Sequence, residues 1–175
     1  MTRFSIIDHL RGARAEAPSD QADTDTVVRI VKELDKLDPN RARYLAAFAY
    51  VLSRVAGADR HISDEETAAM VTIVERDGQL PKAQATLVVE IAKTQNRLFA
   101  ATEDFLVTRE FRDIASESQR HELLECLFAV AQADRVMSSE EDVEMRQIAS
   151  QLGFSHAEYI AARLAHGVTR TGRAG

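Results

Sequence analysis

The chain has 175 residues, 45% of them hydrophobic, and a formal net charge of −6 from 28 acidic and 22 basic side chains. This length and apolar content suit one globular domain, or two half-domains that share a core. Nucleic-acid binding needs a concentrated basic surface. Because the basic residues here are scattered among acids, we expect no nucleic-acid partner.

The chain has a single cysteine and no long apolar run. Cys126 alone cannot form an intrachain disulfide, which fits a reducing compartment, and its apolar neighbours in ELLECLFAV predict a core position. The longest apolar stretch, YLAAFAYVL at 44–52, has nine residues, well short of the roughly 20 that cross a bilayer. We therefore predict a cytoplasmic protein that contacts membranes only peripherally or through a partner.

The composition predicts an all-α fold of about eight helices, because prolines and glycines are few and no stretch alternates β-branched with polar residues. We expect three parts. Residues 1–25 form a short amphipathic helix and an acidic linker, residues 26–166 form the helical domain, and residues 167–175 form a disordered tail.

Helix starts and stops divide this domain. Helices are expected over 26–37 and 38–57, with Asp38 as the cap and Pro39 in the first turn. Further helices are expected from 64 to the glycine of RDGQLP, over about 81–99, over about 103–115, and through Leu123 to Val130. The next helix is expected to end at Gly153, and the last to span 155–167. In the second helix the i, i+3, i+4, i+7 spacing predicts one buried face, made of Tyr44, Leu45, Phe48, Val51, Leu52 and Val55.

One stretch occurs twice. VAGADRHISDEE at 55–66 recurs as VAQADRVMSSEE at 130–141, 75 residues later and with eight of twelve positions identical. Met70 and Ile73 recur downstream as Met145 and Ile148, at spacings that suit an inner helix face. The sequence thus predicts two pseudo-symmetric helix-turn-helix units, at about 39–78 and 116–153, packed into one bundle.

Each copy ends one helix and starts another. Ser63 with Glu66, and Ser138 with Glu141, have the spacing of a capping box, in which serine and glutamate satisfy each other's backbone N–H groups. Ser155 and Glu158 have the same spacing before the last helix. These glutamates therefore have a structural explanation without any ligand.

The aspartates of the repeat, Asp59 and Asp134, have two interpretations. Each lies four residues before the capping serine, where an aspartate can accept bonds from loop N–H groups in an Asx turn. Alternatively, the aspartate, the serine oxygen and a glutamate line a small pocket that suits a hard divalent cation. Residues alone leave both interpretations open.

These segments resemble a known family. VAGADRHISDEETAAM and LFAVAQADRVMSSEEDVEMRQIASQLGFSHAEY are similar to the two signature segments of the tellurite-resistance TerB family, in which an apolar helix precedes A-D-G-x-[IVM]-S-x-x-E and a second helix. The resemblance covers about residues 40–165. It implies an all-α fold of two units, no established catalytic activity, and an interaction platform in tellurite and envelope stress responses. It also implies metal ligands at Asp59, Glu65, Glu66, Asp134, Glu140 and Glu141.

The chain departs from the family pattern after each aspartate, where the usual glycine is replaced by Arg60 and Arg135. Glycine permits a left-handed backbone there, so the turn is built differently or is strained. A guanidinium in this place can also pair with the aspartate and replace a cation. The substitution therefore argues against metal binding.

An enzyme is the weakest hypothesis. The histidines lack the H-E-x-x-H spacing of zinc sites and the E-x-x-H spacing of di-iron bundles, and the chain has no glycine-rich phosphate loop; they are His9, His61, His121, His156 and His166. We predict a non-enzymatic module that binds protein partners, with a divalent-cation binder or sensor as the alternative. No cofactor other than such a cation is expected, and the sequence does not determine the oligomeric state.

Overall fold

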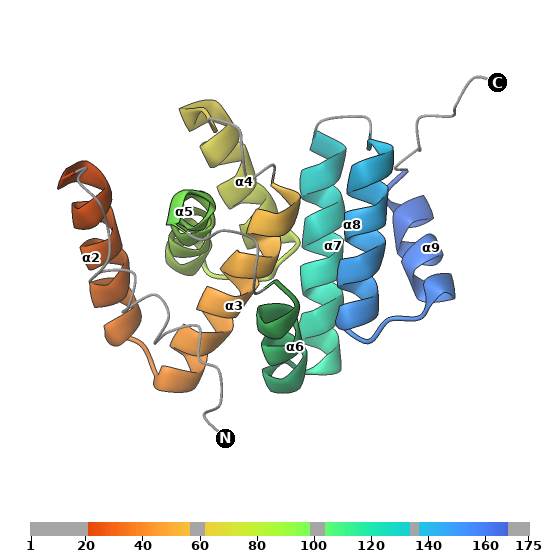
Figure 1. The fold of residues 1–175 in the computed structure, drawn as a ribbon, viewed down its shortest axis with the longest axis horizontal. Helices are drawn as coiled ribbons and strands as arrows, with labels where there is room; N and C mark the ends of the chain where they lie inside the picture. Colours follow the sequence, from red (N-terminus) through yellow and green to blue (C-terminus); the bar gives the residue numbers. More distant parts are fainter. Residues whose placement is uncertain (1–20, 57–61, 99–103, 134–136, 168–175) are drawn as a thin grey trace.

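The structure, a computed structural model, describes residues 21–56, 62–98, 104–133 and 137–167. These residues form eight α-helices (Figure 1), which confirms the all-α prediction: α2 (Gln21–Asp35), α3 (Pro39–Val55), α4 (Asp64–Arg76), α5 (Lys82–Leu98), α6 (Asp104–Ile114), α7 (Glu117–Ala133), α8 (Ser139–Gln151) and α9 (His156–Ala165). The expected N-terminal helix and nearly all of the expected tail lie outside the described residues.

Helix α2 begins earlier than expected. The acidic stretch 17–25 is predicted to be a linker, but α2 already begins at Gln21. Its apolar residues Val27, Ile30, Val31 and Leu34 are buried. Because the packing of that face stabilises the whole helix, the polar residues before Thr26 are helical as well.

Two units of three helices each form the body of the molecule. The second helices, α4 at 64–76 and α8 at 139–151, are related by the same 75-residue offset as the sequence repeat. In both units the third helix packs on the first two: α5 on α3 and α4, and α9 on α7 and α8. Between the units, α4 packs on α7 and α8 packs on α3. Exchanging the two units turns the contact between α4 and α7 into the contact between α8 and α3, as a pseudo-two-fold arrangement requires.

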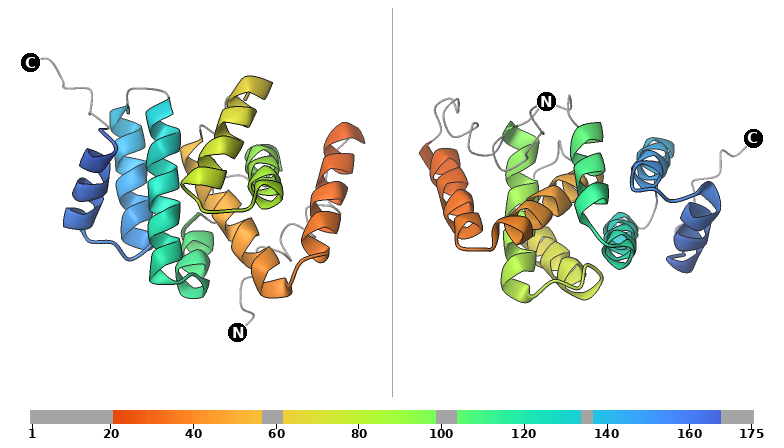
Figure 2. Two further views of the ribbon diagram at one scale, coloured as in Figure 1. Left: turned by 180° about the vertical axis from the view of Figure 1, so that it is seen from behind. Right: turned by 90° about the horizontal axis from the view of Figure 1, so that it is seen from below.

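The remaining two helices break this symmetry. Helix α2 packs on α3 and α5 of the first unit, whereas α6 packs on both units, through α3 and α8. As a result α2 and α9 lie at opposite ends of the long axis (Figures 1 and 2). Helix α3 lies in the middle and is the most buried, with eleven buried residues from Ala42 to Ser53.

The core contains most of the predicted inner face of α3. Leu45, Phe48, Val51 and Leu52 are fully buried, whereas Val55 at the end of the helix is only partly buried. Tyr44 and Phe48 contact Phe111 of α6 with ring centroids 5.3 and 6.0 Å apart. Cys126 is 0% exposed, and burial raises the pKa of its thiol. It is a core residue, as predicted.

The predicted helix ends are confirmed where local chemistry defines them. The Asp38 carboxylate accepts from the N–H groups of Asn40 and Arg41, and Pro39 occupies the first turn of α3. Helix α8 ends at Gln151, and Gly153 just beyond its C-cap has a φ of 93°, which is left-handed and so favours glycine. There the N–H of Phe154 donates to the carbonyl of Ala149 at 2.9 Å.

Candidate functional site

The two repeated turns form the predicted capping boxes. In the first, the N–H of Glu66 donates to Ser63 Oγ at 3.1 Å, and the N–H of Ser63 donates to Glu66 Oε2 at 2.7 Å. In the second, Ser138 and Glu141 repeat both bonds with the same lengths. Helices α4 and α8 are therefore started by the same device, and one carboxylate oxygen of each glutamate is already bound.

The third box begins α9. The N–H of Glu158 donates to Ser155 Oγ at 3.3 Å, while both the N–H and the hydroxyl of Ser155 donate to Glu158 Oε2 at 2.7 Å. Hydrogen bonds from the backbone and side chain of Ser155 lower the pKa of Glu158. The carboxylate thus stays ionised at the positive end of the helix dipole.

Removal of the hydroxyl of a cap serine tests how much its capping box contributes to stability. We expect Ser138→Ala to lower the free energy of unfolding by about 1 kcal/mol, because one N–H at the start of α8 loses its acceptor. Ser139→Ala, at the exposed next residue, is the matched control and should change it by less than about 0.5 kcal/mol. Urea unfolding measures both. Equal values for the two variants would contradict a role of the hydroxyl.

The predicted metal ligands are described only in part. Asp59 and Asp134, with Arg60 and Arg135, lie outside the described residues, so their place at the turns stays a prediction. Glu65 and Glu140 are exposed in the first turns of α4 and α8. Across the part of the chain that the structure describes, no three histidine, cysteine, aspartate or glutamate side chains lie close enough to hold a metal ion. The described glutamates fit caps better than a cation site, because the helix dipole disfavours positive charge there.

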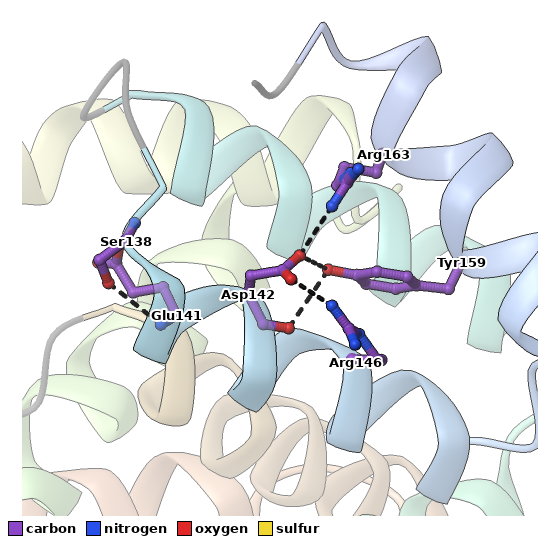
Figure 3. A network of polar contacts seen from close by, with 6 residues as sticks. All are labelled: Ser138, Glu141, Asp142, Arg146, Tyr159 and Arg163. Carbon is purple, nitrogen blue, oxygen red and sulfur yellow. Dashed lines mark hydrogen bonds and ion pairs between the residues drawn. The ribbon is translucent and has the colours of Figure 1, made fainter. Parts of the chain in front are cut away.

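A buried polar network lies one residue beyond the second box and was not predicted. Asp142 of α8 is 1% exposed. Its Oδ1 accepts from the Tyr159 hydroxyl at 2.7 Å and from Arg163 Nη1 at 3.0 Å, and its Oδ2 accepts from Arg146. Figure 3 shows the tyrosine and both arginines converging on this carboxylate. The network joins α8 to α9.

The electrostatics of the network favour the ionised carboxylate. Burial alone would raise the pKa of Asp142, but the hydrogen bonds from Tyr159 and Arg163 and the positive charge of Arg146 outweigh it, so that the pKa lies below its ordinary value of 3.8. For Tyr159, burial and its bond to the Asp142 carboxylate raise the pKa. A neutral phenol therefore donates to an anion.

Among its described residues, the first unit has no such network at the equivalent position. The position equivalent to Asp142 is Thr67, whose hydroxyl donates to the Ser63 carbonyl and accepts from Lys93 Nζ, both at 2.8 Å. The two turns are therefore alike at their caps and different just behind them. The i, i+4 spacings of Asp142 with Arg146 and of Tyr159 with Arg163 were the only sequence signals for the network.

A surface groove adjoins the network. It has a volume of about 650 Å³ and is lined by α6, α8, the loop after α8 and the first turn of α9. Phe105 is 50% exposed and Val143 is 60% exposed, and both line it. Val143 faces outward because α8 directs its neighbour Asp142 toward α9.

The described histidines have ordinary packing roles. The ring of His121 meets Phe154 at a centroid distance of 4.7 Å, and His156 lies beside Tyr159 at 6.3 Å. His166 bonds Glu125 and stacks on Phe128. His9 and His61 lie outside the described residues.

Comparison with protein families gives one match. A family model described as "Tellurite resistance protein TerB" matches residues 44–164, more than half of the chain, and this agrees with the resemblance seen in the repeat. Neither a curated protein nor a solved structure matches. None of the described helices combines the length and the apolarity needed to cross a bilayer.

Proposed function

Because the chain belongs to the tellurite-resistance TerB family, we propose that it is a non-enzymatic helical module that acts through protein partners in a tellurite or envelope stress response. One observation carries the proposal. Phe105 and Val143, from two different helices, expose apolar surface on the same groove. Exposed apolar surface gathered in one place is typical of interaction sites.

The chemistry of the described residues supports a binding role over a catalytic one. An active site needs a nucleophile or a general acid or base held free for a substrate. Here Asp142 is saturated by two arginines and a tyrosine, and Cys126 is a buried thiol with a raised pKa. Glu66 and Glu141 act as cap residues. Each of these groups is therefore engaged in the fold.

Cross-linking in cells followed by affinity purification tests this role. We expect a specific protein partner with the full chain, under unstressed or tellurite-stressed conditions. Recovery of the protein alone in both conditions would count against the proposal. A chain whose fold is disrupted, such as Leu45→Asp in the fully buried core, controls for nonspecific capture.

A divalent-cation binder is the alternative. Its supporting observation is that Glu65 and Glu140 occupy equivalent exposed positions next to the two repeated turns. With Asp59 and Asp134 they would provide the carboxylate oxygens that calcium and magnesium prefer. A cation held there would link the start of each second helix to the turn before it.

Melting experiments with calcium, magnesium, manganese and zinc test the alternative. A ligand that binds only the folded state raises its stability, so a cation at about 100 times its dissociation constant adds about 2.7 kcal/mol. The gain should vanish in Asp59→Ala combined with Asp134→Ala. Glu75→Ala, at an exposed position far along α4, should keep it. No shift at millimolar ion would eliminate this function.

A further inference from the structure

The groove beside the Asp142 network has walls of different chemistry. Phe105 on α6 and Val143 on α8 expose apolar surface on it, and Phe154 lies at the loop after α8. Since Phe105 and Val143 are at least half exposed, the groove is open, which suits a chain segment lying across it better than a small molecule that must be enclosed.

The charge on this groove is positive, in contrast to the chain as a whole. No aspartate or glutamate is among the described residues that line it, although the chain has 28 such residues. The guanidinium of Arg146 does line it. At the rim, the Arg109 guanidinium lies 5.4 Å from the centre of the Phe105 ring.

The Asp142 network leaves part of this charge uncompensated. One carboxylate faces two guanidinium groups, those of Arg146 and Arg163. The Arg146 side chain is 44% exposed and that of Arg163 only 19%, so the excess positive charge is accessible through Arg146. Of the nearby carboxylates, Glu144 pairs with Arg54, and the ionised Glu158 carboxylate caps the start of α9.

We propose that this groove binds a helical segment of a partner protein that presents apolar side chains at i, i+3, i+4 or i+7 and a carboxylate. The apolar side chains contact Phe105 and Val143, and the carboxylate pairs with Arg146 (Figure 3 shows its guanidinium beside Asp142). This is the helix-in-groove mode of recognition. The inference rests on the proposed interaction role and names the chemistry of the partner.

A phage-displayed library of random 16-residue peptides, panned on the full chain, tests the proposal. We expect enrichment of amphipathic sequences with an acidic residue beside the apolar face. The best synthetic peptide is then measured by fluorescence anisotropy. Val143→Asp should weaken its binding at least about tenfold, and glutamine in place of the acidic residue of the peptide should do the same.

Leu164→Asp is the matched control, because Leu164 is an exposed apolar residue of α9 outside the groove lining. It should leave binding unchanged, and unchanged helicity of both variants excludes unfolding. No enrichment, enrichment of peptides without this pattern, or equal binding by Val143→Asp would each overturn the proposal. A dimer in sedimentation that Val143→Asp dissociates would also overturn it, because the occupant would then be a second copy.

The outcomes separate this inference from the proposed function. If Val143→Asp recovers from cells the same partner as the wild type, the groove assignment fails while the interaction role stands. If no partner is recovered from cells but peptide binding depends on Val143, the proposed stress-response role fails and the groove remains a peptide-binding site.

Discussion

Replacement of Asp142 by asparagine is expected to lower the free energy of unfolding by about 3 kcal/mol. The change keeps the size of the side chain but removes the negative charge that Arg146 and Arg163 share. Removing one partner of a buried ion pair costs about 3–5 kcal/mol, because the remaining charge is left without compensation. We expect the lower end, since Arg146 is 44% exposed and can turn toward water. For a chain of this size the melting temperature should fall by roughly 10 °C.

Asp113→Asn is the matched control for this substitution. Asp113 also pairs with an arginine, Arg112, but its side chain is 57% exposed. Exposed pairs contribute little, so the change should be less than about 0.5 kcal/mol. If the two variants unfold at the same urea concentration, Asp142 does not hold α8 to α9 in the way that its contacts indicate.

The pH dependence provides an independent measurement of the same effect. The folded-state pKa of Asp142 lies below its ordinary value of 3.8. The carboxylate therefore contributes stability above that value, and the contribution is lost as the pH falls through the lower folded pKa. The gap between wild type and Asp142→Asn should be constant between pH 5 and 7, and it should shrink below about pH 4. A gap that stays constant at acid pH would contradict this origin.

The sequence predicted those features that local chemistry determines. The capping boxes at Ser63, Ser138 and Ser155 were visible because a serine and a glutamate three residues apart contain the whole device. The start of α3 was visible for the same reason, in the pair Asp38 and Pro39. The repeat predicted the two-unit architecture, since two similar segments bury similar faces.

Features that depend on contacts between helices were missed. In the sequence Asp142 is one of several acids in the first turn of its helix, and the packing of α9 on α8 buries it. The same packing leaves its neighbour Val143 60% exposed. Helix α2 begins five residues earlier than expected because its buried face packs on α3 and α5. At the candidate metal site, Asp59 and Asp134 remain predictions.

The contacts of Arg54 also come from distant parts of the chain. Arg54 lies near the end of α3, and its side chain is 5% exposed. Its Nε donates to Glu144 Oε1 at 2.7 Å, and its Nη1 donates to Gln151 Oε1 at 2.7 Å and to Thr108 Oγ1 at 2.8 Å. One guanidinium thus joins α3 of the first unit to α6 and to α8 of the second. The equivalent residue of the second unit is Ala129, so Arg54 itself has no counterpart across the pseudo-two-fold axis.

Arg54→Met is therefore expected to lower the free energy of unfolding by about 3 kcal/mol. Methionine keeps much of the apolar stem, so the loss reports on the polar contacts rather than on a cavity. The estimate is at the low end of the usual range because Glu144 is 35% exposed and can be solvated once the arginine is gone. Arg29→Met is the matched control. Arg29 also pairs with a glutamate, Glu90, but is 56% exposed, so its replacement should cost less than about 0.5 kcal/mol.

A double-mutant cycle with Glu144→Gln separates the ion pair from the other contacts of Arg54. If the pair links the units, the double variant should be less destabilised than the sum of the single variants, with a coupling of about 1 kcal/mol or more. Additive effects would show that Arg54 acts through Thr108 and Gln151 instead.

The number of unfolding transitions tests the link between the units. Because these contacts join both units across α3 and α8, the wild type should unfold in one transition. In Arg54→Met the two units should unfold in two separate transitions. A single transition in Arg54→Met would show that apolar packing between the units is enough to keep them cooperative.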